Sequence, residues 1–121
     1  MRMEIETRMS EQIACYLDLA TAEAKLTAAN MANVDTPGYR TVGMDFEAEM
    51  REAMDDVNDG RTPRKSHFVE VDGLVARPDG NNVSIDRESL NLAEAQLKFK
   101  TGVALLHQEY QRVMDAIHAD K

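Results

Sequence analysis

The side chains that could perform chemistry are few and lie far apart along the chain. The three histidines are His67, His107 and His118, and Cys15 is the single cysteine. Zinc sites and nucleophilic catalysts need Cys, His and acidic residues at ligand spacing, and none of these four belongs to such a pattern. The sequence also contains no phosphate-binding loop and no nucleophile motif. We therefore expect a protein that is not an enzyme and that has no catalytic residues, no cofactor and no metal.

A second candidate is the run of carboxylates between Asp45 and Asp59. This stretch holds seven acidic residues and a single basic one, Arg51. Paired carboxylates can act as acid and base or hold a cation, but the spacing matches no calcium-binding loop. Apolar residues recur in the stretch at helical intervals, and Asp45 is a suitable N-cap. We expect a short helix with a solvated acidic face.

The composition excludes several classes of protein. The formal net charge is −8 over 121 residues, and residues 1–60 carry all of it, with 13 acidic and 5 basic side chains. Nucleic-acid binding needs basic groups that neutralise phosphates, so we expect no nucleic-acid partner. Aromatic residues make up 5% of the chain, which is little material for a large self-sufficient core. The lone Cys15 excludes an intramolecular disulfide bond.

Neither a membrane span nor a signal peptide is visible. No apolar run approaches the roughly 20 residues of a transmembrane helix. Residues 1–11 are too charged to contain the apolar part of a signal peptide. These features are typical of a cytoplasmic protein, and a protein exported through a dedicated channel without cleavage would share them.

The first half of the chain contains a long predicted helix. Residues spaced alternately by 4 and 3 predict a helix over residues 10–32 with one seam. Small alanines beside the seam would allow a partner helix to approach closely. The seam consists of Ile13, Leu17, Ala20, Ala24, Thr27, Met31 and Val34.

The helix runs into the segment Asn30-Met31-Ala32-Asn33-Val34-Asp35-Thr36-Pro37-Gly38-Tyr39. Pro37 and Gly38 fit the central positions of a type II turn, in which Gly supplies the positive φ. Asn33 suits a left-handed helix end, and Asp35 can bond the backbone two residues on. We expect the following residues to set the turn and its contacts: Asn30, Asn33, Asp35, Thr36, Pro37, Gly38 and Tyr39.

The middle of the chain is less regular. Residues 58–67 form a polar loop with Arg61, Arg64 and Lys65, which can pair with the acidic helix, contact another subunit or stay solvated. Residues 68–85 favour strands, with a hairpin turn at Asp72-Gly73. Such a small two- or three-stranded element must pack on a helix to be stable.

The strongest pattern lies in residues 86–120. Positions spaced alternately by 4 and 3 predict a long helix that Ser84 or Asp86 caps. Gly102 is unfavourable in a helix by about 1 kcal/mol against Ala, and its expected use is close helix approach. The seam consists of Leu92, Gln96, Phe99, Val103, Leu106, Tyr110, Val113 and Ile117.

These elements predict a mainly α fold. The long N- and C-terminal helices should form an antiparallel coiled-coil-like pair, with a short helix and a small β-rich or loop insert at one end. The predicted units are residues 1–39 for the first helix and turn, 40–85 for the insert and 86–121 for the second helix. Two helices cannot bury a seam on all sides, so the remaining stripe must meet neighbouring molecules.

Two segments resemble a known family. The turn segment resembles the motif Asn-Ile-Ala-Asn-x-x-Thr-Pro-Gly-(Tyr/Phe) of bacterial flagellar axial proteins, with Met31 in place of Ile. Residues 79–88 resemble Gly-Asn-Asn-Val-Asp-(Leu/Ile)-Asp-x-Glu of proximal rod proteins of the FlgB type, with Ser84 in place of the first Asp. The resemblance covers residues 10–118. The matching positions of the second segment include Gly80, Asn81, Asn82, Val83 and Asp86.

The resemblance implies a structural subunit of the flagellar basal-body rod. Such a subunit would be exported by the flagellar type III apparatus without a cleaved signal peptide and would lie in the periplasm. Its terminal helices would polymerise into a helical assembly, the drive shaft that links the membrane ring to the hook. The implied partners are other rod subunits, the junction of the rod with the membrane ring, and the export apparatus.

Two alternatives remain open at this point. A rod subunit of the FlgC type shares the terminal motif. A soluble acidic helical adaptor or secretion chaperone would share the acidity, the high methionine content (eight residues) and the seams, but it would not need the turn segment.

Overall fold

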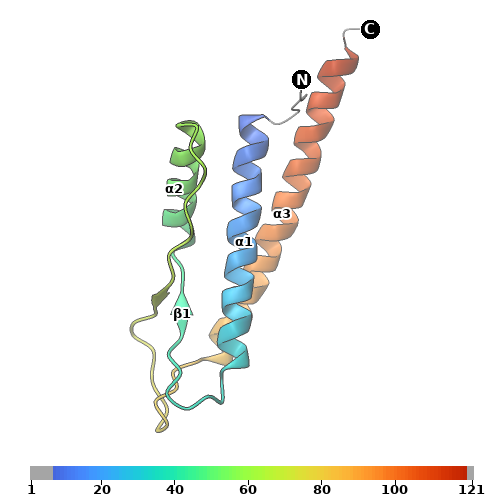
Figure 1. The fold of residues 1–121 in the computed structure, drawn as a ribbon. Coiled ribbons are helices and arrows are strands. Elements are labelled where there is room, and N and C mark those ends of the chain that lie inside the picture. Colours follow the sequence, from blue (N-terminus) through green and yellow to red (C-terminus); the bar gives the residue numbers. More distant parts are fainter. Residues whose placement is uncertain (1–6, 120–121) are drawn as a thin grey trace.

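The computed structural model describes residues 7–119, which form a mainly helical chain (Figure 1). The elements in order are α1 (Arg8–Ala32), β1 (Val42–Gly43), α2 (Phe46–Asn58), β2 (Val69–Glu70) and α3 (Ile85–His118). The long helices α1 and α3 run antiparallel, which confirms the predicted fold class. The outer ends of the predicted terminal units, residues 1–6 and 120–121, lie outside the described residues. None of the described helices is long and apolar enough to cross a membrane.

Side-chain caps begin all three helices. The Thr7 hydroxyl accepts the Ser10 backbone N–H at 3.0 Å, and the Ser10 hydroxyl accepts the Thr7 N–H at 2.9 Å, so α1 begins two residues earlier than predicted. Asp45 caps α2 as predicted. Of the two candidate caps of α3, Ser84 is the one used, while Asp86 lies in the first turn.

Small residues form the contact between α1 and α3. The buried residues of α3 are Glu88, Ala95, Gly102 and Glu109, which are spaced by seven and therefore lie in one line along the helix. A Cβ atom at Gly102 would lie 2.5 Å from Leu17 Cδ2, so this glycine allows the close helix approach that the sequence predicts. The two helices are therefore held at a distance that larger side chains would not permit.

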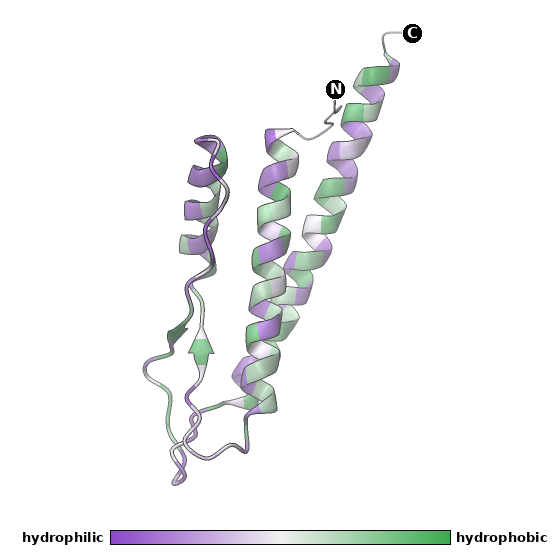
Figure 2. Cartoon of the chain, in the orientation of Figure 1, coloured by the Kyte–Doolittle hydropathy of each residue, from purple (hydrophilic) through white to green (hydrophobic). Residues whose placement is uncertain are grey.

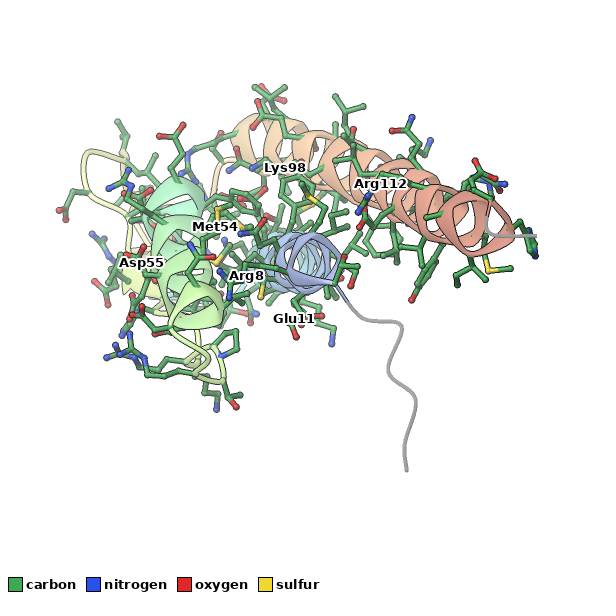
Figure 3. The ribbon with its side chains drawn as sticks, turned by 90° about the horizontal axis from the view of Figure 1, so that it is seen from above. Arg8, Glu11, Met54, Asp55, Lys98 and Arg112 are labelled. Atoms are coloured by element: carbon green, nitrogen blue, oxygen red, sulfur yellow. The ribbon has the colours of Figure 1, made fainter. Side chains whose placement is uncertain are left out.

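The helix α2 packs along the other side of α1, so α1 lies between α2 and α3 (Figures 1 and 3). Ala53 and Val57 of α2 pack on Cys15 of α1. The prediction that the insert lies at one end of the helical pair is therefore wrong for α2, because this helix has an apolar face of its own that must be buried.

One cluster joins α1 and α3 to the first residue of α2. The rings of Tyr16 in α1 and Phe46 in α2 meet edge to face, with centroids 5.6 Å apart. Lys98 of α3 places its ammonium 3.8 Å from the centroid of the Phe46 ring and 3.2 Å from a carboxylate oxygen of Glu23. Through this cation–π contact, a side chain of α3 packs on a side chain of α2.

The sheet differs from the prediction. β1 and β2 pair antiparallel, with Val42 opposite Glu70 and Gly43 opposite Val69. The hairpin predicted at Asp72-Gly73 is wrong, because β2 pairs with a strand that precedes α2 rather than with the segment that follows it. Residues 83–85, predicted as a strand, lead directly into the cap and first turn of α3.

Replacing Gly102 by Ala tests the close packing of α1 on α3. Alanine improves helix propensity by about 1 kcal/mol, but the overlap with Leu17 should outweigh it and lower stability by about 1–2 kcal/mol. The measurement is urea unfolding followed by circular dichroism. The exposed neighbour Thr101, replaced by Ala, is the control and should be neutral or stabilising. A higher urea midpoint for Gly102→Ala would contradict the packing described above.

Candidate functional site

A buried polar cluster joins the C-terminal end of α1 to the start of α3. We call it the polar junction and define it as Asn30, Tyr39, Asn81, Asn82 and Glu88. The largest side chains that the fold buries completely are polar, and three of them, Glu88, Asn30 and Asn81, belong to the junction. Burial of polar groups is costly unless they are hydrogen-bonded, so the geometry of this cluster is tightly constrained.

Asn30 is the centre of the junction, and its side-chain amide uses all of its hydrogen-bonding capacity. Its Nδ2 donates to the Val42 carbonyl at 2.8 Å and to Glu88 Oε2 at 3.1 Å. Its Oδ1 accepts the Tyr39 hydroxyl at 2.9 Å and the Val42 N–H at 3.1 Å. One side chain of α1 therefore holds the strand β1, the end of the turn segment and the first turn of α3.

The carboxylate of Glu88 is buried but fully partnered. Arg87 Nη1 donates to Glu88 Oε1 at 2.6 Å, while Asn30 occupies Oε2. Glu88 also lies in the first turn of α3, where the helix dipole favours an anion. These contacts compensate for the loss of hydration that burial imposes on the charge.

The two sequence motifs meet in the junction. Asn81 Nδ2 donates to the carbonyls of Asn33 at 2.9 Å and of Thr36 at 2.8 Å. Asn82 Oδ1 accepts the Thr41 N–H at 2.6 Å, and the Asn82 N–H donates to the Tyr39 carbonyl at 3.3 Å. The segment before α3 therefore adds a second donor to the carbonyls of Asn33 and Thr36, which already accept backbone N–H groups within the turn, and it supplies the donor for the Tyr39 carbonyl.

The Pro37-Gly38 turn has the predicted conformation. Gly38 has a φ of +75°, and the Tyr39 N–H donates to the Thr36 carbonyl at 3.2 Å, as in a type II turn. Gly80, which has a φ of +88°, lies against this turn, and the carbonyl of the preceding residue Asp79 accepts the Gly38 N–H at 2.9 Å. The two glycines thus permit backbone contact between the motifs.

Three residues of the predicted site do not have the roles that the sequence predicted for them. Asn33 does not adopt the left-handed conformation, because its φ is −100°; instead its Nδ2 donates to the Ala29 carbonyl at 2.8 Å. Asp35 and Asp86 are exposed and take no part in the junction.

Glu88 and Arg77 are site residues that the sequence patterns do not predict. The Arg77 guanidinium donates to the carbonyls of Val83, at 3.0 Å, and Val34. It lies in the segment for which no specific role was predicted, and no local pattern distinguishes it from a solvated arginine. Glu88 is the last residue of the second motif, but only the position of Asn30 explains its burial.

The acidic face of α2 is not simply solvated, because an extended segment folds back along it. We call residues 61–67 the strap. Asp56 is buried and accepts Arg61 Nη2 at 3.0 Å and the Arg64 N–H at 3.3 Å. Arg64 Nε lies 3.7 Å from Glu52, and the His67 N–H donates to Glu49 at 3.1 Å. Of the alternatives open for the basic loop, local pairing within the chain is the one observed.

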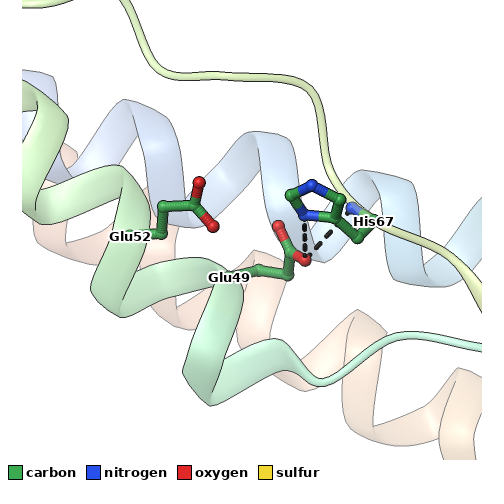
Figure 4. Close-up of side chains that lie close together, drawn as sticks. All are labelled: Glu49, Glu52 and His67. Atoms are coloured by element: carbon green, nitrogen blue, oxygen red, sulfur yellow. Dashed lines mark hydrogen bonds and ion pairs between the residues drawn. The ribbon is translucent and has the colours of Figure 1, made fainter.

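Glu49, Glu52 and His67 form a group with potential metal ligands within 4.8 Å of one another (Figure 4). His67 Nδ1 lies 3.1 Å from Glu49 Oε1, so this pair already forms a hydrogen bond. Glu52 faces the Arg64 guanidinium, which disfavours a second cation beside it. Pairing between strap and helix accounts for the geometry of all three side chains, and we assign no metal to them.

The residues predicted as helix seams occupy two different environments. In α1, Ile13 and Ala20 are buried, and Leu17 and Ala24 are half-buried. In α3, Leu92, Leu106 and Val113 are half-buried, and four residues are 45–49% exposed. The predicted coiled-coil-like pairing, in which the seam of each helix faces the other helix, is therefore wrong for these four residues, because the small residues Ala95 and Gly102 occupy the contact line instead. The four exposed residues are Phe99, Val103, Tyr110 and Ile117.

Replacing Asn30 by Ala tests whether the polar junction stabilises the fold. The change leaves Val42 N–H and C=O unpaired and removes one donor from the buried Glu88, so stability should fall by about 3 kcal/mol. Urea unfolding measures it. The exposed Asn58 is a matched control, and Asn58→Ala should change stability by less than about 0.5 kcal/mol. Equal urea midpoints for the two variants would show that the junction is dispensable.

The strap predicts a dependence of stability on pH. Burial alone would raise the pKa of Asp56, but the hydrogen bonds and charges of Arg61 and Arg64 outweigh it and hold that pKa below its ordinary value. A carboxyl whose folded pKa is depressed contributes stability above its unfolded pKa and loses it as the pH falls through the folded value.

Asp56→Asn should therefore lower the urea midpoint at neutral pH. The urea midpoint of this variant should also fall less than that of the parent when the pH is lowered below about 4. The neighbouring Asp55 is exposed and points away from α1 (Figure 3). The urea midpoint of Asp55→Asn should therefore fall at low pH as much as that of the parent. Identical pH profiles for Asp56→Asn and the parent would contradict this role of the strap.

Comparison with known proteins identifies relatives over most of the chain. No protein-family model matches. The chain is 30% identical over 119 residues to the flagellar basal body rod protein FlgB of Salmonella typhimurium, covering 84% of this chain and 86% of that protein. It is 31% identical to FlgB of Cereibacter sphaeroides, over 86% and 89% of the two chains, and 32% identical to FlgB of Borrelia hermsii, over 68% and 75%. The chain belongs to the FlgB family of flagellar basal-body rod proteins.

Proposed function

We propose that this chain is a structural subunit of the proximal flagellar rod and that it polymerises through its terminal helices. The observation that carries the proposal is an uncovered apolar ridge on α3. We define the ridge as Phe99, Val103, Tyr110, Met114 and Ile117, which are all between 42% and 49% exposed. The relatives of the chain are named rod proteins, which favours this function over an adaptor or secretion chaperone and over the FlgC type.

The ridge lies on one side of α3, beside the line that contacts α1. Its residues are spaced so that they follow one another along the helix surface. Apolar residues continue to the C-terminal end of α3, as Figure 2 illustrates. An exposed apolar stripe of this length is typical of an interaction surface, because completing the burial of one such side chain contributes on the order of 1 kcal/mol.

The two helices are also of unequal length, which leaves part of the ridge without a neighbour. The Thr7 hydroxyl, at the start of α1, donates to Glu109 of α3 at 2.7 Å. The residues of α3 that follow Glu109 therefore extend past α1 (Figure 1). Met114 and Ile117 belong to this overhang and are 42% and 48% exposed within residues 7–119, so we infer that another molecule covers them.

We infer that a groove on the same chain receives the ridge of a neighbouring molecule. Between α1 and α3 lies a shallow groove of about 450 Å³ lined mainly by small or apolar side chains, among them Ala20, Ala24 and Ala95, with Phe99 at its edge. The C-terminal end of the ridge and this groove lie on different parts of the chain, so their contact is head-to-tail. Such a contact builds an open helical assembly when its rotation does not close a ring.

The polar junction has a supporting role in this proposal. It holds the start of α3 against the end of α1 and thereby sets how the ridge is presented. In this view residues 1–39 and 86–121 are the helical core of the subunit, and residues 40–85 are an insert. The site residues of the turn and of the motif before α3 act by positioning the helices and perform no catalysis.

The remaining parts of the proposal concern location and partners. We infer that the subunit is exported by the flagellar type III apparatus without a cleaved signal peptide and assembles in the periplasm. Its partners would be other rod subunits and the junction of the rod with the membrane ring. The support is the family membership together with an incomplete apolar surface, which suits a subunit that becomes fully ordered only on assembly.

Placing a charge on the ridge should block assembly without unfolding the subunit. Tyr110→Asp should leave helicity unchanged, because the side chain is half exposed, and should reduce swimming and incorporation into basal bodies at least about tenfold. The assay is complementation of a strain that lacks its own copy of the protein, followed by quantification of the subunit in purified basal bodies.

The matched control places the same charge elsewhere on α3. Gln108 is exposed and lies on the far side of the helix, because two positions turn the helix by roughly 200°. Gln108→Asp should support normal swimming. Normal incorporation of Tyr110→Asp, or an equal loss in both variants, would remove the ridge from the assembly surface.

A further inference from the structure

The chain contains three Asp-Gly pairs, Asp59-Gly60, Asp72-Gly73 and Asp79-Gly80. In such a pair the amide nitrogen of Gly can attack the side-chain carboxyl carbon of Asp, because Gly has no Cβ to hinder the approach. Whether the reaction occurs in a folded protein depends on the freedom of both groups. The three pairs differ in the hydrogen bonds and ion pairs that hold their reacting groups.

In the first pair, Asp59-Gly60, both the amide and the carboxylate have partners. The Gly60 N–H donates to the Val57 carbonyl at 3.0 Å. The Asp59 carboxylate lies 3.2 Å from Arg61 Nη2. Attack would require both contacts to break.

The third pair is held more firmly because it belongs to the segment that packs on the turn. The Gly80 N–H donates to the Arg77 carbonyl at 2.8 Å, and Asp79 Oδ1 accepts the Asn81 N–H at 3.0 Å. The Asp79 carbonyl accepts the Gly38 N–H at 2.9 Å. Ring closure here would disrupt the backbone contact between the two motifs.

The Asp72-Gly73 pair is free. Both residues are exposed, and within residues 7–119 neither has a hydrogen-bond partner. A Cβ atom built on Gly73 would meet nothing within 4 Å. The nearest backbone hydrogen bonds on either side join the Val71 N–H to the Thr41 carbonyl and the Arg77 N–H to the Asn81 carbonyl. The loop after β2 between them runs along the outside of the fold (Figure 1). It can therefore rearrange locally without breaking the rest of the structure.

We propose that Asp72-Gly73 is a site of spontaneous isoaspartate formation in the folded protein. In the protonated form of the Asp72 carboxyl, the Gly73 amide nitrogen forms a bond to Cγ and the bond from Cγ to the hydroxyl oxygen breaks. The hydroxyl group leaves with the amide proton as water, giving a five-membered succinimide. Water then adds to either ring carbonyl. Opening at Cγ restores aspartate, and opening at the α-carbonyl leaves the main chain running through Cβ with a free α-carboxylate.

The modification would lengthen the main chain by one carbon in a loop tied at both ends. The loop joins β2 to Arg77, whose guanidinium contacts the carbonyls of Val34 and Val83. This inference does not rest on the proposed function, because it follows from the contacts of the three pairs alone.

The test is long incubation of the whole folded protein at neutral pH, at a temperature below its unfolding transition. Mass spectrometry of peptides then quantifies isoaspartate at the three pairs, which serve as controls for one another. In the folded chain, position 72 should accumulate at least about tenfold more isoaspartate than position 59 or 79, because only the other two must first break hydrogen bonds.

Two further arms separate the effect of the fold from that of local sequence. In urea the three rates should become similar, because the protecting contacts are lost. Asp72→Glu should abolish the modification at this position while keeping the charge, since its longer side chain would have to close a larger ring. The proposal is overturned if position 72 is no faster than the other two in the folded chain, or if its lead persists unchanged in urea.

Discussion

The buried contact between Asn30 and Glu88 is the constraint on which the rest of the structure depends. A carboxylate and an amide with about 1% exposure must have partners for every polar atom, and their partners come from α1, β1, the turn segment and α3. The arrangement is satisfied only when these four segments meet. The polar junction therefore sets where α1 ends, how the chain reverses and where α3 begins.

The helix contact that starts at this junction relies on small residues and not on large apolar ones. Ala95 and Gly102 allow α3 to approach Leu17 and Ala20 closely, and the carboxylates of Glu88 and Glu109 close the two ends of the contact line. The apolar side chains of the ridge are then left outside the contact line. The packing that completes the subunit thus leaves an apolar surface available for other molecules.

Charge is compensated locally on the other side of α1. Glu49, Glu52 and Asp56 lie on one face of α2, and the strap brings Arg61, Arg64 and His67 against them. Part of the acidic excess of residues 1–60 is neutralised within the chain by this pairing. The same pairing explains why carboxylates and a histidine converge without any need for a metal ion, and it allows α2 to cover Cys15 of α1.

The sequence by itself determined the features that depend on neighbours along the chain. The three helices, the Asp45 cap and the Pro37-Gly38 turn follow from local propensity and hydrogen bonding, and the two motifs indicated the family. Only the tertiary structure decided which stripe of α3 faces α1, because residue spacing reports hydrophobicity but not the space that Gly102 leaves. It also decided that Glu88 would be buried, since its partner Asn30 lies in a distant segment whose approach no local pattern specifies.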